Sequence, residues 1–264
     1  MVYRKRAFRA GWPAVLVACC TVAVSVFTAC TKDEPVLPED PEETTHENTY
    51  YKLQRIENMP TGSEDNSASL DSRPPVFFNF GLKETVDEKY AKTKRWDISF
   101  GGMFNCYLSG NNGQNATNHG FMGPGVGGIA IVEKAFDEVV DIPEDSAFKT
   151  DVDVIGSDAN GDYGDKVGWF LYDFNGSIVS DGRPEKHHVA YALSEPLTLK
   201  SGKVIPPRTL IVRTATGDYA KIKMISCYKD LFSKDQWFID SPFIYFTFEY
   251  VLVPKGSTRF EIRD

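Results

Sequence analysis

The residues best suited to bind a ligand are histidines, and the chain has four of them. They are His46 in an acidic segment, His119 in "NGQNATNHGFMG", and the adjacent pair His187 and His188 in "RPEKHHVAYAL". A neutral imidazole is a ligand for haem iron and for divalent metals. Neighbouring residues of a strand point to opposite faces, so we expect at most one of the pair to face a given pocket. A histidine pair that is simply solvated at the surface is the alternative.

A glycine-rich stretch, "GPGVGG" at residues 123–128, has the spacing of a dinucleotide-binding fingerprint. That fingerprint needs a preceding strand and a helix that starts on its last glycine. Here Pro124 interrupts the motif, and the following "GIAIVEK" has the composition of a strand. The stretch is therefore predicted to be a glycine-rich loop.

A second stretch, "DANGDYGD" at residues 158–165, spaces its acidic and amide residues like part of a calcium loop. The calcium loop of an EF-hand has glycine at its sixth position and glutamate at its twelfth. This chain has Tyr163 and Trp169 at those positions. We therefore expect a turn between strands, and weak calcium binding is left open.

The sequence carries no signature of catalysis. It contains no GxSxG or HExxH motif on which a nucleophile or a catalytic metal would be built. Acidic pairs such as Asp137–Glu138 and Glu144–Asp145 have the pattern of surface runs. The chain is predicted not to be an enzyme.

Residues 1–29 have the pattern of an export signal, a basic start followed by an uncharged stretch. Thr28 and Ala29 are small, and the stretch resembles a bacterial lipobox that ends at Cys30. By this resemblance Cys30 is the lipidated N-terminus of the mature chain. An uncleaved membrane anchor is the alternative. The following Lys32-Asp33-Glu34 resembles a surface-export signal, although a charged linker would look the same.

The composition of the remaining residues predicts a tether followed by a folded domain. Residues 30–48 are acidic and rich in proline, which predicts a disordered tether. Residues 49–264 are predicted to form one all-β domain. The full chain has 29 basic and 37 acidic residues, and four of the basic ones lie in the signal. This acidic balance argues against a nucleic-acid partner.

Several segments alternate or run together in strand-forming residues. The clearest are "VFFNFGL", "RWDISFGGMFNCYL", "GGIAIVEKAF", "VGWFLYDF", "RTLIVRTATGDYAKIKMISCY" and "FIYFTFEYVLV". Thr216-Gly217-Asp218 is a hairpin signal within the fifth of them. The best helix candidate, "EKAFDEVVDI", is short at most. The pattern predicts an antiparallel all-β fold. Cys106 and Cys227 could form one disulfide or remain two buried thiols.

Taken together, these segments resemble the HmuY family of haem-binding surface lipoproteins of Gram-negative bacteria, over roughly residues 74–254. The resemblance implies an antiparallel β-sandwich-like single domain whose extended two-stranded fingers grip haem. It also implies haem or haemoproteins as partners and a TonB-dependent receptor in the outer membrane. The expected location is the outer membrane, lipid-anchored and exposed at the cell surface, with a role in iron acquisition.

The resemblance does not carry the family's haem ligands over. Well-known members use two histidines, one before and one after the strand that "VGWFLYDF" resembles, and some relatives use methionine. Here Asp173 and Phe174 follow that strand, whereas His187 and His188 lie beyond it. We still expect His188 or His187 to supply an axial ligand, because no other histidines lie in this part of the sequence.

Within this hypothesis, Trp169 and Tyr172 could line the pocket. Cations for the haem propionates would come from Lys186, Arg183 or Lys200. The alternative hypothesis is a surface module that kept the fold, lost haem and now binds a glycan, a peptide or a partner protein.

Overall fold

The structure is a computed structural model that describes residues 49–62 and 73–263. These residues belong to one compact unit, Leu37–Asp264, and the other unit, Met1–Val36, lies outside the described residues. The predictions for the export signal, Cys30, the tether and His46 therefore concern residues outside this range. In the described part, no helix is both long enough and apolar enough to span a membrane.

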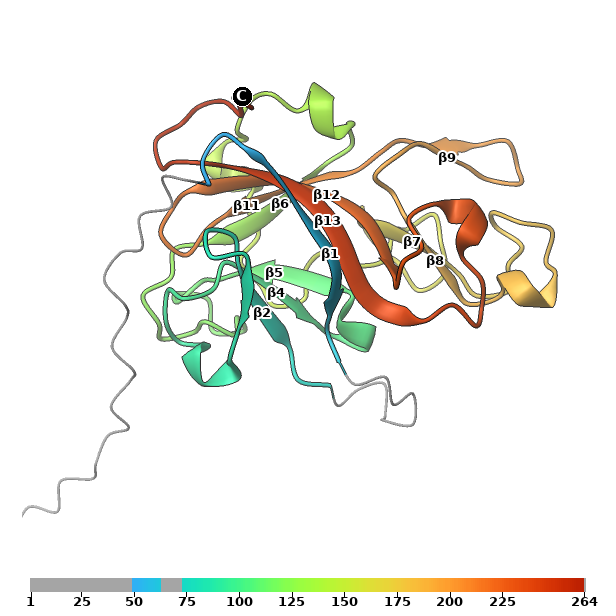
Figure 1. The fold of residues 1–264 in the computed structure, drawn as a ribbon, viewed down its shortest axis with the longest axis horizontal. Helices are drawn as coiled ribbons and strands as arrows, with labels where there is room; N and C mark the ends of the chain where they lie inside the picture. The colour runs from blue at the N-terminus through green and yellow to red at the C-terminus, as the bar shows by residue number, and fades with distance from the viewer. Residues whose placement is uncertain (1–48, 63–72, 264) are drawn as a thin grey trace, which may run out of the picture. The chain divides into compact units, whose positions relative to one another are not determined.

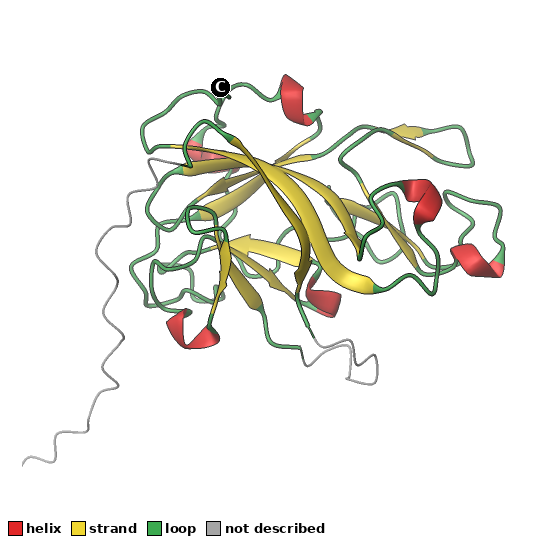
Figure 2. Cartoon of the chain, in the orientation of Figure 1, coloured by secondary structure: helices red, strands yellow, loops and turns green. Residues whose placement is uncertain are grey.

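The described residues form mostly short strands joined by irregular loops (Figure 2). In chain order the strands are β1 (Leu53–Pro60), β2 (Val76–Asn79), β3 (Glu84–Val86), β4 (Ile98–Gly101), β5 (Tyr107–Gly110), β6 (Gly128–Val132), β7 (Phe170–Asp173), β8 (Val189–Ala192), β9 (Leu197–Thr198), β10 (Val204–Ile205), β11 (Thr209–Arg213), β12 (Tyr219–Tyr228) and β13 (Phe243–Val253). Every pair of these strands is antiparallel, so the predicted fold class is confirmed.

Helical structure in the described part is limited to single 3₁₀ turns. They are η2 (Glu88–Tyr90), η3 (Met103–Asn105), η4 (Phe136–Glu138), η5 (Asp145–Ala147), η6 (Pro184–Lys186) and η7 (Lys234–Gln236). The predicted helix candidate "EKAFDEVVDI" contains only η4, because β-branched residues and Pro143 follow it.

Two sheets build most of the domain (Figure 1). One has five strands in the order β1-β13-β12-β11-β6, and the other has four in the order β3-β2-β4-β5. The predicted hairpin is present, with Arg213 of β11 paired with Tyr219 of β12 around the Thr216-Gly217-Asp218 turn. Two smaller sheets, β7–β8 and β9–β10, have two strands each.

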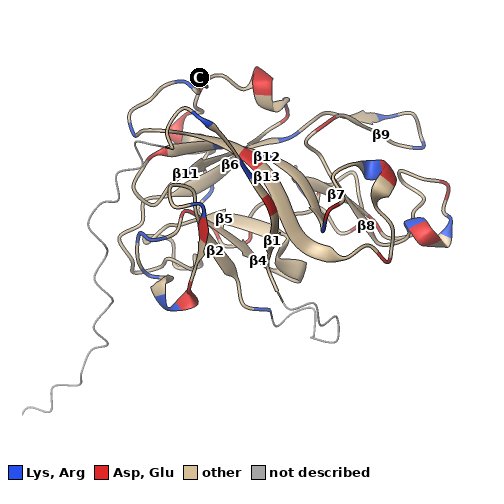
Figure 3. Cartoon of the chain, in the orientation of Figure 1, with Lys and Arg blue, Asp and Glu red and all other residues tan. Residues whose placement is uncertain are grey.

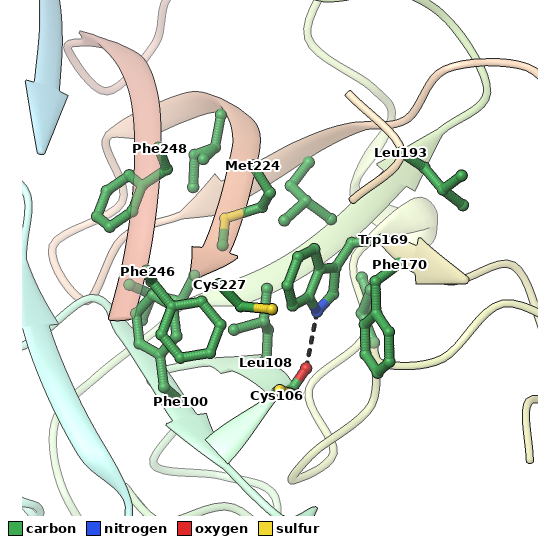
Figure 4. Close-up of a cluster of buried hydrophobic side chains, with 14 of the residues drawn as sticks. Phe100, Cys106, Leu108, Trp169, Phe170, Leu193, Met224, Cys227, Phe246 and Phe248 are labelled. Carbon is green, nitrogen blue, oxygen red and sulfur yellow. Dashed lines mark hydrogen bonds between the residues drawn. The ribbon is translucent and has the colours of Figure 1, made fainter. Parts of the chain in front are cut away.

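The main core lies between the two large sheets and is rich in aromatic rings. Ring centroids of Phe78 and Phe248 are 5.4 Å apart, and those of Phe100 and Phe246 are 4.9 Å apart. Alternate residues of β13 face this core, as the period of two in a strand requires. Trp169, directly before β7, extends the core, and its Nε1–H donates to the carbonyl of Cys106 at 2.7 Å (Figure 4). Burial of these rings anchors the β7–β8 hairpin to the sandwich.

The two sheets approach each other closely where β5 ends and β6 begins. A Cβ atom on Gly110 would lie 2.7 Å from backbone atoms of Gly128. No side chain fits in that space, so glycine is required at Gly110 by close backbone approach. The N–H of Gly127 donates to the carbonyl of Asn111 at 2.6 Å, which holds this edge together.

One lysine of β12 is buried. Ala220, Ile222 and Met224 face the main core as the alternation predicts. Lys221, on the other face, is nevertheless buried, and its Nζ donates to the carbonyls of Phe136 and Val139 at 2.8 Å. Burial lowers the pKa of Lys221. The loop around η4 therefore covers the outer face of β12.

Candidate functional site

Of the predicted pair, His188 lies on an exposed aromatic surface. It directly precedes β8 and adopts a left-handed backbone with φ of 58°. Its N–H donates to the carbonyl of Phe174 at 3.1 Å. Its Nδ1 lies 2.8 Å from Oη of Tyr172, and its ring meets that of Phe174 edge-on at 4.6 Å. The backbone conformation therefore turns the imidazole toward the end of β7.

The neighbouring His187 is held inside its own loop. It is half-buried, and its Nε2 lies 3.1 Å from the carbonyl of Gly182. Gly176 has φ of 62°, and a Cβ there would lie 2.8 Å from the carbonyl of Lys186. This tight loop places the two imidazoles in different surroundings. Their separation was expected, although the structure achieves it in a loop rather than on a strand.

We call the surface formed by Tyr163, Tyr172, Phe174 and His188 the aromatic face. The ring of Tyr163 lies 6.0 Å from that of Tyr172 and 5.9 Å from that of Phe174. Tyr163 is 73% exposed and Phe174 is 37% exposed. An exposed cluster of rings is typical of a surface that binds a partner or a ligand. Sequence analysis identified His188 and Tyr172 but not Tyr163 or Phe174 as members.

Asp162 and Asp173 position the aromatic face. Asp162 accepts a hydrogen bond from the N–H of Phe174 at 2.8 Å, and its own N–H donates to the carbonyl of Tyr172 at 2.8 Å. The loop at 158–165 is thereby held against β7. Asp173 is fully buried, and its Oδ2 accepts from the backbone N–H groups that follow the strand. Both ends of the face are therefore fixed by carboxylates that bind backbone.

The hydrogen bond between Tyr172 and His188 has chemical consequences. Burial raises the pKa of Tyr172 to about 12, so its hydroxyl stays protonated at neutral pH. If Nδ1–H of His188 donates to that hydroxyl, the lone pair of Nε2 is left for a metal. Ligating histidines commonly donate their second ring N–H in this way, which orients the ring. The arrangement can therefore present one imidazole nitrogen to an iron atom.

Other residues predicted to serve haem have different roles. Trp169 is 1% exposed and belongs to the core. Lys186 is buried, with Nζ 2.7 Å from the carbonyl of Trp237 and 3.7 Å from the ring centroid of Phe238. Arg183 pairs with Asp181 and Glu185, so charges of both signs gather around η6 (Figure 3). Lys200 is exposed.

A pocket of about 200 Å³ adjoins the aromatic face through Tyr163. Its charged lining residues are Asp151, Asp153, Asp165 and Lys166, and Tyr107 also lines it. Burial raises the pKa of Asp153 to about 6. Ligand pockets for drug-sized molecules measure about 300–1,000 Å³, so this one is too small to enclose a porphyrin.

Beside this pocket, two buried polar atoms meet at Gly101. A Cβ on Gly101 would lie 2.5 Å from Oδ1 of Asp153 and 3.4 Å from Nε2 of His119. Neither atom has a hydrogen-bond partner among the described residues. Burial lowers the pKa of His119, which favours its neutral form. No sequence signal links residues so far apart in the chain, and this juxtaposition was not predicted.

The calcium-like loop uses its first aspartate for structure. Asp158 pairs with Arg208 at 2.9 Å, and it also accepts from the N–H groups of Asn160 and Gly168. These bonds lower its pKa against the effect of burial. Among the described residues, no three His, Cys, Asp or Glu side chains are placed to hold a metal ion. Cys106 and Cys227 are both buried as free thiols.

Comparison with known proteins identifies the family. A sequence model of the HmuY protein matches residues 73–237, which is more than half of the chain. No curated protein matches. A crystal structure from Bacteroides vulgatus, described as an HmuY-like heme binding protein, aligns with 78% of this chain and 93% of its own. Its sequence identity is 12% and its TM-score is 0.30, too low to support an argument. On the strength of the sequence match, this chain belongs to the HmuY family.

Proposed function

We propose that the chain is a surface-tethered lipoprotein that binds haem or a related porphyrin for uptake, and that His188 supplies an axial ligand. Family membership supports the class of ligand. The observation that carries the proposal is the placement of His188, whose Nδ1 is held by Tyr172 while its ring lies on an exposed surface. Within this proposal Nε2 binds the iron.

His188 suits this role better than His187. The Nε2 atom of His187 contacts the carbonyl of Gly182, and its ring is half-buried in the loop. Using it as a ligand would require that loop to open. His188 needs no such movement, because Tyr172 contacts only the opposite ring nitrogen.

The aromatic face provides the apolar contact that a porphyrin requires. Tyr163 and Phe174 are exposed and meet nearly perpendicular to each other, at 88°. A flat ligand lying on either ring would bury apolar area that water now covers, which is favourable at about 25 cal/mol per Å². The small pocket beyond Tyr163 would stay outside the porphyrin ring.

The rest of the proposal concerns location and partners. We propose lipidation at Cys30, attachment to the outer membrane with exposure at the cell surface, and transfer of haem to a TonB-dependent receptor. The sequence of the N-terminal segment supports lipidation and attachment to the outer membrane. We also propose that the chain is a binding protein without catalytic activity.

The test is a visible-absorption titration of residues 48–264 with ferric and ferrous haem. The variant His188→Asn removes the imidazole, and asparagine tolerates the left-handed backbone at that position. The matched control is His187→Asn. We expect a saturating Soret band that is lost in His188→Asn and kept in His187→Asn. Loss in the control alone would assign the ligand to His187, and saturating binding in the double variant would exclude both histidines.

A second candidate function is a surface module that binds a glycan, peptide or partner protein. The observation in its favour is charge, because Asp162 lies against the aromatic face and Lys186 is occupied elsewhere. Haem propionates would find little compensation there. Absence of any specific haem band at micromolar haem would support this candidate. Loss of glycan binding in Tyr163→Ala, measured on a glycan array, would then identify the aromatic face as the binding surface.

A further inference from the structure

The pocket that adjoins Tyr163 combines negative charge with aromatic walls. Asp151, Asp153 and Asp165 line it, and Lys166 is the one basic residue among its lining residues. None of the three carboxylates forms an ion pair with a described residue. The pocket therefore holds a net negative charge within a small concave space, where field lines concentrate.

The carboxylates act on the interior of the pocket rather than only on its rim. Burial, above all, raises the pKa of Tyr107, and the charges of Asp165 and Asp153 raise it further. The charges of both carboxylates therefore reach the Tyr107 hydroxyl. Oδ1 of Asp153 is buried without a hydrogen-bond partner in the described structure. This oxygen lies beside Gly101 and His119 rather than at the pocket surface, while the charge of its carboxylate still acts on Tyr107.

The spacing of the three carboxylates favours an extended cation over a small metal ion. The three carboxylates are not close enough together for one ion to bind all of them. A longer cation that spans the pocket could approach several of them in turn. The rings of Tyr107 and Tyr163 would offer their faces to the same charge, since cations are attracted to aromatic rings. The valines of the lining, Val152, Val154 and Val167, would contact an alkyl chain.

We infer that this pocket binds an ammonium or guanidinium group carried on a short alkyl chain. Such a group can come from a free small amine or from a lysine or arginine side chain of a partner protein. The inference concerns a site distinct from the proposed haem ligand, and it holds whether or not haem binds. The alkyl chain of the ligand would contact the valines, and its N–H groups would contact the carboxylates.

The experiment is an NMR titration of the haem-free protein, residues 48–264, with butylammonium. Amide signals of Gly156, Tyr163 and Val167 report on the pocket. We expect saturable shifts at these amides, and none with butyrate or butanol at equal concentration. Equal shifts with butanol or butyrate would overturn the role of charge. No saturable shift with butylammonium, with butylguanidinium or with the peptide described next would overturn the site itself.

Variants make the test specific. Asp165→Asn should weaken butylammonium binding about two- to fivefold, the effect of one exposed charge. Lys166→Gln should strengthen it by a similar factor, because it removes a like charge. Asp137→Asn on η4, which does not line the pocket, is the matched control and should change nothing. Binding that ignores Asp165→Asn and Lys166→Gln would contradict the inference.

A second arm distinguishes the two sources of the cation. The blocked tripeptide Gly-Lys-Gly carries the same ammonium group on a protein backbone. Tighter binding of this peptide than of butylammonium would indicate a partner protein. Equal or weaker binding would indicate a free amine. Both results keep the site, whereas the haem titration reports only on the aromatic face, so the two proposals can fail separately.

Discussion

At the scale of single residues, one hydrogen bond determines which nitrogen of His188 faces outward. Tyr172 holds Nδ1 at 2.8 Å, and this contact fixes the ring on the aromatic face. His187, one residue earlier, contacts a backbone carbonyl of its own loop instead. Two adjacent histidines thus differ in which ring nitrogen is left for a ligand, and their hydrogen-bond partners cause the difference.

Removing that hydrogen bond should weaken haem binding while keeping the ring. In Tyr172→Phe, His188 loses the partner that orients it, and we expect affinity to fall about tenfold or more. Soret titration measures the change. The control is Tyr163→Phe, which removes the hydroxyl of another exposed ring of the face. Equal affinity of Tyr172→Phe and the unchanged protein would show that Tyr172 does not orient the ligand.

The two cysteines should be unreactive in the native protein. Burial raises the pKa of Cys227 to about 12 and that of Cys106 well above its ordinary value, so the reactive thiolate is scarce. We expect no reaction of these thiols with Ellman's reagent at pH 8 in residues 48–264. Two thiols should react after unfolding in denaturant. Absence of both reactions would indicate a disulfide between Cys106 and Cys227.

At the scale of elements, Asp97 joins the start of β4 to the β11–β12 turn. Its carboxylate accepts from the N–H of Phe80 at 3.0 Å and from that of Ala215 at 3.2 Å. The side chain is almost fully buried. Burial raises its pKa to about 7 despite these hydrogen bonds. A carboxyl group at this junction therefore makes the contact between the two sheets sensitive to pH.

Because folding raises the pKa of Asp97, the folded state binds the proton more tightly than the unfolded chain. Its stabilising contribution is complete below about pH 4 and is lost as pH rises through about 7. A rise of about three pKa units corresponds to about 4 kcal/mol. Urea unfolding at several pH values should show this slope in the unchanged protein and not in Asp97→Asn. Identical slopes would place the pKa of Asp97 near its ordinary value.

Close approach of β5 and β6 gives a second prediction at this scale. In Gly110→Ala the new methyl group meets the backbone of Gly128, which cannot yield as a side chain can. We expect a loss of about 2–3 kcal/mol in unfolding free energy. Gly202→Ala has nothing within 4 Å and should lose about 1 kcal/mol through its left-handed backbone alone. Thermal unfolding compares the two, and equal losses would count against a packing role for Gly110.

Strands could be predicted from sequence more fully than the site. Alternation over β13 places Phe246, Phe248 and Tyr250 in the core because side chains of a strand alternate regardless of distant residues. Burial of Lys221 could not be predicted, because its carbonyl partners come from the distant loop around η4. The left-handed backbones of Tyr163 and His188 build the aromatic face, yet a positive φ is uncommon for any residue other than glycine, so the sequence does not mark these positions.

At the scale of the whole molecule, β13 runs from the neighbourhood of Tyr50, near the first described residues, to the neighbourhood of the β7–β8 hairpin. Tyr50 bridges Leu252 at one end of β13. At the other end Phe243 pairs with Tyr228, whose hydroxyl accepts from the N–H of Ala190 in β8. The 11 residues of β13 span about 35 Å at about 3.3 Å per residue. The first described residues therefore lie at one end of β13, and the β7–β8 hairpin, which carries the proposed haem ligand, lies at the other end.

The same strand sets the limits of the folding unit. The HmuY match spans residues 73–237 and so excludes both β1 and β13. In the structure, β13 is the second strand of the five-stranded sheet and pairs with both β1 and β12. Its rings also form the centre of the core, where Phe80 and Tyr250 lie 5.0 Å apart. The matched region alone therefore lacks one wall of its own core.

We expect residues 49–264 to unfold cooperatively and residues 73–237 not to fold. Without β13, the apolar faces of β2, β4 and β12 would be exposed to water, and β12, paired only with β11, would become an edge strand. Circular dichroism during heating and dispersion of amide NMR signals measure both fragments. A cooperative transition in residues 73–237 would show that the four-stranded sheet, β7–β8 and the remaining strands β6, β11 and β12 suffice for a core. The fold would then not depend on the aromatic strand that fills its centre.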